Sequence, residues 1–140
     1  MNDAADGAAR RTPRILVIDD DLPNRTLTLA ILGRSAEPAL AGATLRHADS
    51  LATARAALGA EPIDLVLLDV HLPDGLGLEL ASELHGQPVR PAIVALTASV
   101  LPADQQAALD SGCDAFLAKP YAAPELVALV AGFLHDRPLA

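Results

Sequence analysis

Residues 14–21 read RILVIDDD, a short apolar run that ends in three aspartates. Two further runs of this kind are IDLVLL at 63–68 and AIVAL at 92–96, and shorter strand candidates lie at 44–47 and 115–118. Apolar runs without alternation are typical of strands that are covered on both faces, as in parallel sheets. The sequence therefore predicts five strands, three of them buried on both faces.

Helical segments are predicted between these strands. Residues 23–32, 102–109 and 124–134 each begin with proline, which is favoured in the first turn of a helix. Residues 50–58 are rich in alanine, residues 77–84 carry leucines one turn apart, and a glycine follows each segment closely. This alternation with short connections predicts the α/β class, as a doubly wound (βα)5 fold around a five-stranded parallel sheet.

The length of the chain, 140 residues, is near the commonest size for one compact domain. Residues 1–13 are small and polar without hydrophobic periodicity, so we predict a disordered lead-in there. One domain is predicted to occupy residues 14–137. A domain of this length buries enough apolar surface to fold without disulfides or a structural metal.

Composition narrows the range of functions. Ten basic against 18 acidic residues give a net charge of −8, whereas a protein that grips the nucleic-acid backbone needs a basic face. The single cysteine, Cys113, excludes an internal disulfide and a cysteine-based zinc site. No apolar run approaches the roughly 18 residues of a membrane span, and the first residues lack the apolar region of a secretory signal. We therefore expect a cytoplasmic protein with neither nucleic-acid nor membrane partners.

Chemically related side chains follow the predicted strands. They are the carboxylates of Asp19, Asp20, Asp21 and Asp69, the hydroxyl of Thr97 and the ammonium of Lys119. In an open parallel sheet, ligands bind at the carboxyl ends of the strands. Carboxylates that converge there repel one another unless a cation joins them, and carboxylate and backbone oxygens are the ligands that Mg²⁺ prefers. The pattern predicts a Mg²⁺ site at this edge.

A hydroxyl and an ammonium beside such a site suit a phosphoryl group in transfer, because its oxygens carry spread negative charge. One carboxylate then acts as the nucleophile, since aspartate can form an acyl phosphate. Singly, each residue also has a structural interpretation. Asp21, before Leu22 and Pro23, is expected to cap a helix. The shared edge of the sheet favours a functional site for the others.

Four motifs in register carry a family resemblance. They are Asp19-Asp20, the stretch DVHLPDGLGLEL at 69–80, Thr97-Ala98 and Lys119-Pro120. Together, from Arg14 to about His135, they resemble the response-regulator receiver domain of two-component signalling. The resemblance implies a flavodoxin-like strand order, 2-1-3-4-5.

The resemblance also implies a role for each residue of the site. Asp69 is expected to accept a phosphoryl group from a sensor histidine kinase or a histidine phosphotransfer protein. Asp19, Asp20, Asp69 and the backbone carbonyl of His71 are expected to hold Mg²⁺. Thr97 would donate a hydrogen bond to the phosphoryl group and Lys119 would pair with it. The Lys119–Pro120 peptide bond is expected to be cis.

A conformational switch is implied by the same resemblance. Thr97 is expected to move toward the phosphoryl group, and Phe116 to rotate inward behind it. The face formed by the helix at 102–109, the strand at 115–118 and the helix at 124–134 would then change its affinity for a downstream protein, or for a second copy in a homodimer. Such a protein is not an enzyme in the usual sense, because it catalyses only its own Mg²⁺-dependent phosphorylation and dephosphorylation.

Two other functions are open to a chain with these residues. A phosphohydrolase of the haloacid-dehalogenase type also uses an aspartate after its first strand, followed by a threonine and a lysine. Against it, Pro23 stands where that family has threonine or valine, and no acidic pair follows Lys119. The second alternative is a receiver-like module that binds partners without phosphorylation. Such modules typically lose one of the site residues, all of which are intact here: Asp19, Asp20, Asp69, Thr97 and Lys119.

Overall fold

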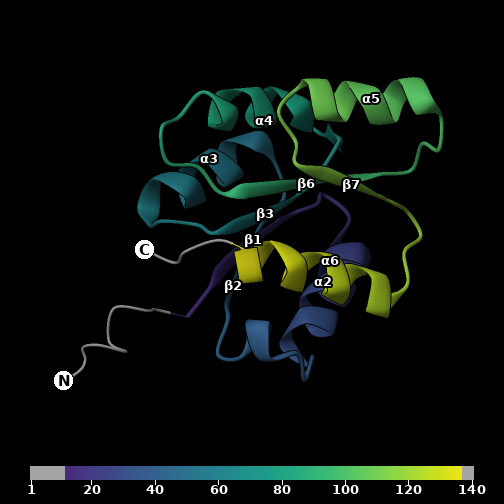
Figure 1. The fold of residues 1–140 in the computed structure, drawn as a ribbon. Helices are drawn as coiled ribbons and strands as arrows, with labels where there is room; N and C mark the ends of the chain where they lie inside the picture. The colour runs from purple at the N-terminus through teal and green to yellow at the C-terminus, as the bar shows by residue number, and fades with distance from the viewer. Residues whose placement is uncertain (1–11, 137–140) are drawn as a thin grey trace.

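The computed structural model describes residues 12–136 (Figure 1). The predicted disordered lead-in falls mainly on residues 1–11, and the predicted end of the domain falls on residue 137, so both lie outside the described residues. Residues 12–136 form an α/β unit in which helices cover both faces of one sheet.

The main sheet has five parallel strands within the described residues. They are β1 (Arg14–Ile18), β2 (Thr44–Ala48), β3 (Leu65–Asp69), β6 (Ala92–Thr97) and β7 (Ala115–Ala118). Their order is β2-β1-β3-β6-β7, and every neighbouring pair is parallel. The numbering skips a small antiparallel hairpin, β4 (His71–Leu72) with β5 (Gly75–Leu76). Without the hairpin, the order is the predicted 2-1-3-4-5, and the flavodoxin-like fold is confirmed.

In the described part of the chain, four α-helices connect the strands of the main sheet and a fifth follows the last strand. They are α2 (Leu22–Gly33), α3 (Leu51–Ala60), α4 (Gly77–His85), α5 (Pro102–Asp110) and α6 (Ala123–Asp136). Figure 1 shows α3, α4 and α5 on one face of the sheet and α2 and α6 on the other. This arrangement is the doubly wound one that the alternation of strands and helices predicts.

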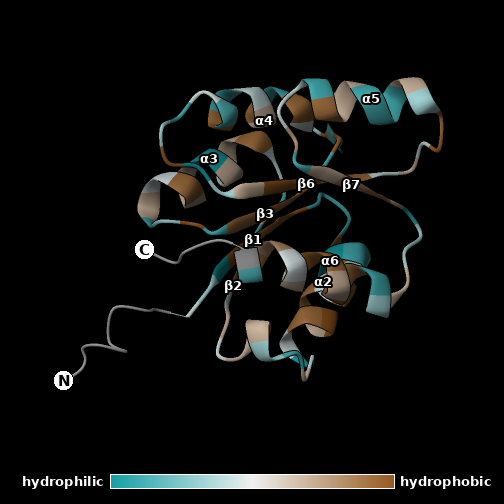
Figure 2. Cartoon of the chain, viewed as in Figure 1, coloured by the Kyte–Doolittle hydropathy of each residue, from teal (hydrophilic) through white to brown (hydrophobic). Residues whose placement is uncertain are grey.

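The core has two halves, one on each face of the sheet. Along β1, Leu16 and Ile18 pack toward α3 and α4, whereas Ile15 and Val17 pack toward α2 and α6. All four side chains are fully buried. Figure 2 shows the central strands as continuously hydrophobic, in contrast to the mixed colouring of the helices. Burial on both faces therefore explains why these strands read as unbroken apolar runs.

The starts of α2 and α3, at the carboxyl edge of the sheet, are capped by side chains. Asp21 caps α2 through a 2.9 Å hydrogen bond from the Asn24 backbone N–H to its Oδ2, which confirms its predicted role. Ser50 caps α3, so the helix predicted to start there begins one residue later. Asp74, from the hairpin, adds two hydrogen bonds from the first N–H groups of α3, at 2.8 and 3.0 Å.

Some predicted boundaries were wrong by one or two residues. The strand predicted at 63–68 begins at Leu65, and just before it the Asp64 carboxylate accepts the Arg14 backbone N–H at 2.8 Å. The helix predicted at 50–58 continues through Gly59 to Ala60, since a glycine does not by itself end a helix. The hairpin and a 3₁₀ turn at Pro38–Leu40 were not predicted.

Candidate functional site

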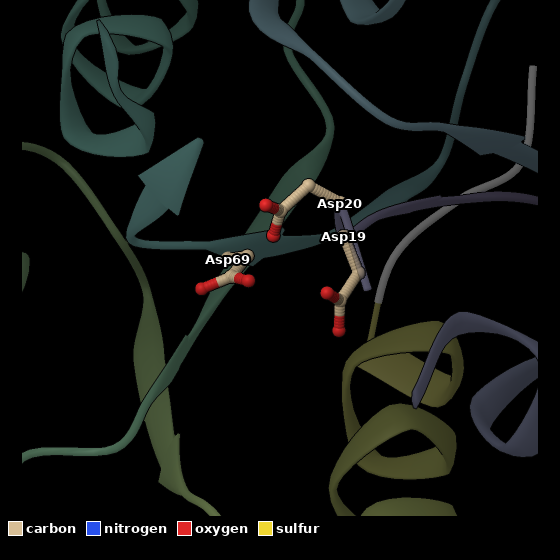
Figure 3. Close-up of side chains that lie close together, drawn as sticks. All are labelled: Asp19, Asp20 and Asp69. Atoms are coloured by element: carbon tan, nitrogen blue, oxygen red, sulfur yellow. The ribbon is translucent and has the colours of Figure 1, made fainter. Parts of the chain in front are cut away.

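The two central strands β1 and β3 bring two acids together at the carboxyl edge of the sheet. Ile18 pairs with Leu68 in the register, and Asp19 and Asp69 are the residues that follow them. Asp20 comes next along the chain, and Figure 3 shows its carboxylate near those of Asp19 and Asp69. One carboxylate oxygen from each of the three acids lies within 4.8 Å of the others. The predicted cluster of Asp19, Asp20 and Asp69 is therefore formed.

The three acids differ in burial. Asp19 is fully buried and Asp69 is 9% exposed, whereas Asp20 lies at the surface. Backbone N–H groups orient the two buried carboxylates: Asp21 N–H donates to Asp19 Oδ1 at 3.0 Å, and His71 N–H donates to Asp69 Oδ1 at 3.3 Å. The second oxygen of each buried carboxylate faces Lys119.

Lys119 enters the cluster from the end of β7. Its Nζ lies 3.2 Å from Asp69 Oδ2 and 3.4 Å from Asp19 Oδ2. Its backbone N–H donates to the Thr97 carbonyl at 2.7 Å, which extends the pairing of β6 and β7 beyond the strand ends. The Lys119–Pro120 peptide bond is cis, as predicted.

The pKa values of Asp69 and Lys119 reflect this crowding. Burial raises the pKa of the Asp69 carboxyl and the nearby Asp19 charge raises it further, although Lys119 acts in the opposite direction. Burial alone would lower the pKa of Lys119, but the charges of Asp69 and Asp19 outweigh it and raise that pKa. The ionised form of Asp69 is thus disfavoured by burial and by the neighbouring acid, and the protonated Lys119 offsets this only in part.

The donor set fits a hard divalent cation. Oxygen ligands about 2.1 Å from Mg²⁺ lie no more than about 4.2 Å apart in an octahedron. Adjacent ligands of such an octahedron lie only about 3.0 Å apart. The three carboxylate oxygens lie within 4.8 Å of one another, so they would draw closer together around the ion. The His71 backbone adjoins the cluster through its N–H bond to Asp69. Asp20, being exposed, leaves one side open to the water ligands that Mg²⁺ retains.

The remaining predicted residues lie around the cluster. Thr97 ends β6 and is 8% exposed, and its Oγ1 accepts a 3.1 Å hydrogen bond from the Ser99 N–H. Phe116, in β7, is partly buried against the half of the core beneath α3 and α4. The His71 side chain is at the surface.

Sequence reasoning missed two residues that support the buried acids. Arg25 donates from Nη1 to the Asp19 carbonyl at 2.8 Å, and so ties the start of α2 to the end of β1. Gly77 packs against the Asp69 backbone so closely that a Cβ atom would collide with the Asp69 carbonyl oxygen. Neither contact could be predicted from hydrophobic periodicity, because both depend on how the start of a helix packs against the end of a neighbouring strand.

A flavodoxin-like sheet with clustered acids and a lysine at its carboxyl edge defines a domain of the receiver class. The family model of the response regulator receiver domain matches residues 15–131, and the chain belongs to this family. The rice "Two-component response regulator ORR41" is 33% identical over 127 residues, covering 89% of this chain and 97% of that protein.

Other relatives are longer than this chain. The "Sensor histidine kinase GacS" of Pseudomonas protegens is 35% identical over 127 residues, which are 86% of this chain and 13% of that protein. The "Transcriptional regulatory protein AruR" of Pseudomonas aeruginosa matches over 46% of its length. Among solved structures, a two-component response regulator from Clostridium difficile has a TM-score of 0.79 and 27% identity, covering 89% of this chain and 97% of that one.

Proposed function

We propose that this chain is a phosphoacceptor receiver that takes a phosphoryl group onto Asp69 from a phosphohistidine donor. The observation that carries the proposal is the buried Asp69 carboxylate, which shares Lys119 with a second buried acid, Asp19. A nucleophilic aspartate needs positive charge around the oxygens of the incoming phosphoryl group. Lys119 and a cation-binding acid cluster supply it at the same edge of the sheet.

In the proposed reaction, an Asp69 carboxylate oxygen attacks phosphorus, the bond from phosphorus to the donor histidine nitrogen breaks, and an acyl phosphate forms. Mg²⁺, held by Asp19, Asp20, Asp69 and the His71 carbonyl, would supply charge that stabilises the phosphoryl oxygens. Lys119 leaves its bond with Asp69 and pairs with the phosphoryl group. The charges of Asp69 and Asp19 raise its pKa, so it enters the reaction protonated.

Thr97 is the proposed sensor of the phosphoryl group. Its hydroxyl oxygen already accepts the Ser99 N–H, which leaves the hydroxyl proton available to donate. When that proton is donated to the phosphoryl group, the connection from β6 to α5 is drawn toward Asp69. Phe116 is partly buried beside the core under α3 and α4, and we propose that it rotates inward to follow this movement.

The proposed output is the face formed by α5, β7 and α6. Val100 and Leu101, at the start of α5, are 71% and 62% exposed, as expected of a surface that binds another protein. We assign to this face a downstream protein target or a second copy of the chain. A sensor histidine kinase or a histidine phosphotransfer protein is the proposed donor. The cytoplasmic location remains a prediction, and no helix of the described residues is long and apolar enough to cross a membrane.

The proposal is tested by intact mass after incubation with acetyl phosphate and Mg²⁺. Wild type should gain one phosphoryl group only when Mg²⁺ is present, and Asp69→Asn should gain none. Asp21→Asn is the matched control: it removes one charge at the same edge, and asparagine caps a helix as well as aspartate does. Asp21→Asn should label like wild type.

The same measurement separates the alternatives. A phosphohydrolase of the haloacid-dehalogenase type would keep its adduct in Asp69→Asn and lose it in Asp19→Asn. A wild type that binds Mg²⁺ but gains no phosphoryl group from acetyl phosphate would contradict the proposal that Asp69 is a phosphoacceptor. That result would favour a module that binds partners without phosphorylation.

A further inference from the structure

A short hydrogen bond joins the loop that carries Lys119 to helix α2. The hydroxyl of Tyr121 lies 2.6 Å from Thr28 Oγ1, between residues 93 positions apart in the sequence. Thr28 is 1% exposed, in the middle of α2, and Tyr121 follows Lys119 by two residues. The bond therefore links helix α2 to the segment that leads from β7 into α6; Figure 1 shows α2 and α6 together on one face of the sheet.

The direction of this bond follows from the other partner of Thr28. The Thr28 hydroxyl donates its single proton to the Asn24 carbonyl at 3.0 Å. Tyr121 is then the donor and Thr28 Oγ1 the acceptor. Both hydroxyl groups are satisfied, and loss of Thr28 Oγ1 would leave a partly buried tyrosine donor without its acceptor.

Few bonds hold the segment from Lys119 to Tyr121 in place. On the side of the sheet, the Lys119 N–H donates to the Thr97 carbonyl at 2.7 Å. Pro120 has no N–H to donate. On the side of α2, the Tyr121 hydroxyl bonds to Thr28, and the tyrosine packs against the half of the core that α2 and α6 cover. The lysine is thus held between β6 and α2.

Helix α2 is also fastened to the acid cluster. Arg25 donates to the Asp19 carbonyl at 2.8 Å, one turn before Thr28. The same helix therefore contacts the backbone of a cluster acid at its start and the lysine loop at its middle. The hydroxyl pair therefore joins the segment of Lys119 to the same helix that holds the Asp19 backbone.

We propose that Tyr121, through Thr28, is a positioning residue for Lys119, which holds its ammonium between Asp19 and Asp69 before phosphoryl transfer. This role rests on the proposed phosphoacceptor function. Tyr121 touches neither the acids nor the phosphoryl group in this role; it acts through the loop.

The test uses variants that change only the hydroxyl pair. Tyr121→Phe removes the donor, Thr28→Val replaces the acceptor by a methyl group, and Thr28→Ser retains the hydroxyl. Ser82→Ala is the control, because the Ser82 hydroxyl also joins two separate segments, through a 3.2 Å bond to the Ser111 carbonyl at the surface, away from the acid cluster. Labelling by acetyl phosphate is followed at saturating Mg²⁺ over a range of acetyl phosphate concentrations.

We expect Tyr121→Phe to lower the maximal labelling rate about three- to tenfold, the effect of losing one neutral hydrogen bond. Thr28→Val should lower it at least as much, because it strands the tyrosine donor. The double variant should be no slower than Thr28→Val, since both remove one interaction. Thr28→Ser and Ser82→Ala should stay within twofold of wild type.

A spectroscopic measurement separates positioning from general loosening. Lys119 is the only lysine of the chain, so protein labelled with ¹³C at lysine Cε gives one side-chain NMR signal. In Tyr121→Phe and Thr28→Val this signal should shift toward that of an exposed lysine, and in Ser82→Ala it should not move.

Rates within twofold of wild type and an unmoved lysine signal in both Tyr121→Phe and Thr28→Val would overturn the positioning role. Equal slowing in Ser82→Ala would overturn it too, because the effect would then be one of stability alone. A wild type that does not label at all would instead refute the proposed function, and this inference with it.

Discussion

Aspartates lie at both the amino and the carboxyl edge of the sheet, but their hydrogen-bond partners differ between the two edges. At the amino edge, Asp64 accepts the backbone N–H of Arg14 at 2.8 Å. Asp114 accepts the Ile93 N–H at 2.8 Å and both terminal nitrogens of Arg90 at 2.9 Å. Each of these acids has at least one strong donor of its own. At the carboxyl edge, Asp19 and Asp69 share the ammonium of Lys119.

The difference arises from the polarity of a parallel sheet. Strand starts present N–H groups, so an acid at the amino edge finds donors in the sheet itself. Strand ends present carbonyl oxygens, which cannot donate to a carboxylate. Acids at the carboxyl edge therefore depend on Lys119, on loop N–H groups and, in our proposal, on a cation. The acids of the amino edge therefore stabilise the fold, whereas the acids of the carboxyl edge outnumber their donors and form the candidate functional site.

The largest effect is expected from removing the shared lysine. Lys119→Ala should lower the rate of labelling by acetyl phosphate about 100-fold, the usual result of removing a charge that stabilises the transition state. It should still bind Mg²⁺, because the acids remain, yet respond poorly to beryllofluoride as a phosphoryl mimic. A normal conformational response to the mimic, seen by NMR, would contradict the role of Lys119.

An intermediate effect is expected at the amino edge, on stability alone. Asp114→Ala removes the carboxylate that accepts hydrogen bonds from Arg90 and from the Ile93 N–H, at a cost of about 2 kcal/mol in the free energy of unfolding. A melting temperature lower by about 5–10 °C is expected. Labelling of the folded protein should be unchanged. A slowed reaction in stably folded Asp114→Ala would show that the two edges are not as separate as their contacts indicate.

The smallest effect, of opposite sign, is expected at the carboxyl edge. Because the pKa of Asp69 is raised in the folded state, its contribution to stability is greatest below the unfolded pKa and is lost as pH rises through the folded pKa. Asp69→Asn removes this loss, so without Mg²⁺ it should be more stable than wild type near neutral pH, by about 1 kcal/mol. The gain should shrink as the pH is lowered; urea unfolding at several pH values measures it. If Asp69→Asn were less stable than wild type near neutral pH, this would contradict the claim that burial and the neighbouring acid disfavour the charge of Asp69.

The sequence was sufficient to predict which acids lie at the carboxyl edge, because their position follows from where the strands end. The apolar runs before Asp19 and Asp69 locate both acids at one edge, and alternation with helices makes that sheet parallel. The amino-edge bonds of Asp64 and Asp114 were not predicted, and the strand predicted to begin at Ile63 begins at Leu65. A carboxylate's choice of a backbone donor depends on the register of two strands, which composition does not specify.

The bond between Tyr121 and Thr28 was beyond prediction for a related reason. Tyr121 packs against the half of the core that α2 and α6 cover. Its hydroxyl partner lies 93 residues away, on a helix whose rotation is set by its whole buried face. Short patterns predict which side chains reach an edge, but long-range pairs depend on the packed structure.

The most direct test of the difference between the two edges is a Mg²⁺ titration of ¹⁵N-labelled protein followed by backbone amide NMR. The account predicts saturable binding of one Mg²⁺ ion, with the largest shifts at residues 19–21 and 69–71 and none near Asp64 or Asp114. In Asp69→Asn the affinity should fall at least about tenfold. Absence of saturable shifts at the carboxyl edge, or equal shifts at both edges, would contradict the claim that the unbalanced acids form a cation site.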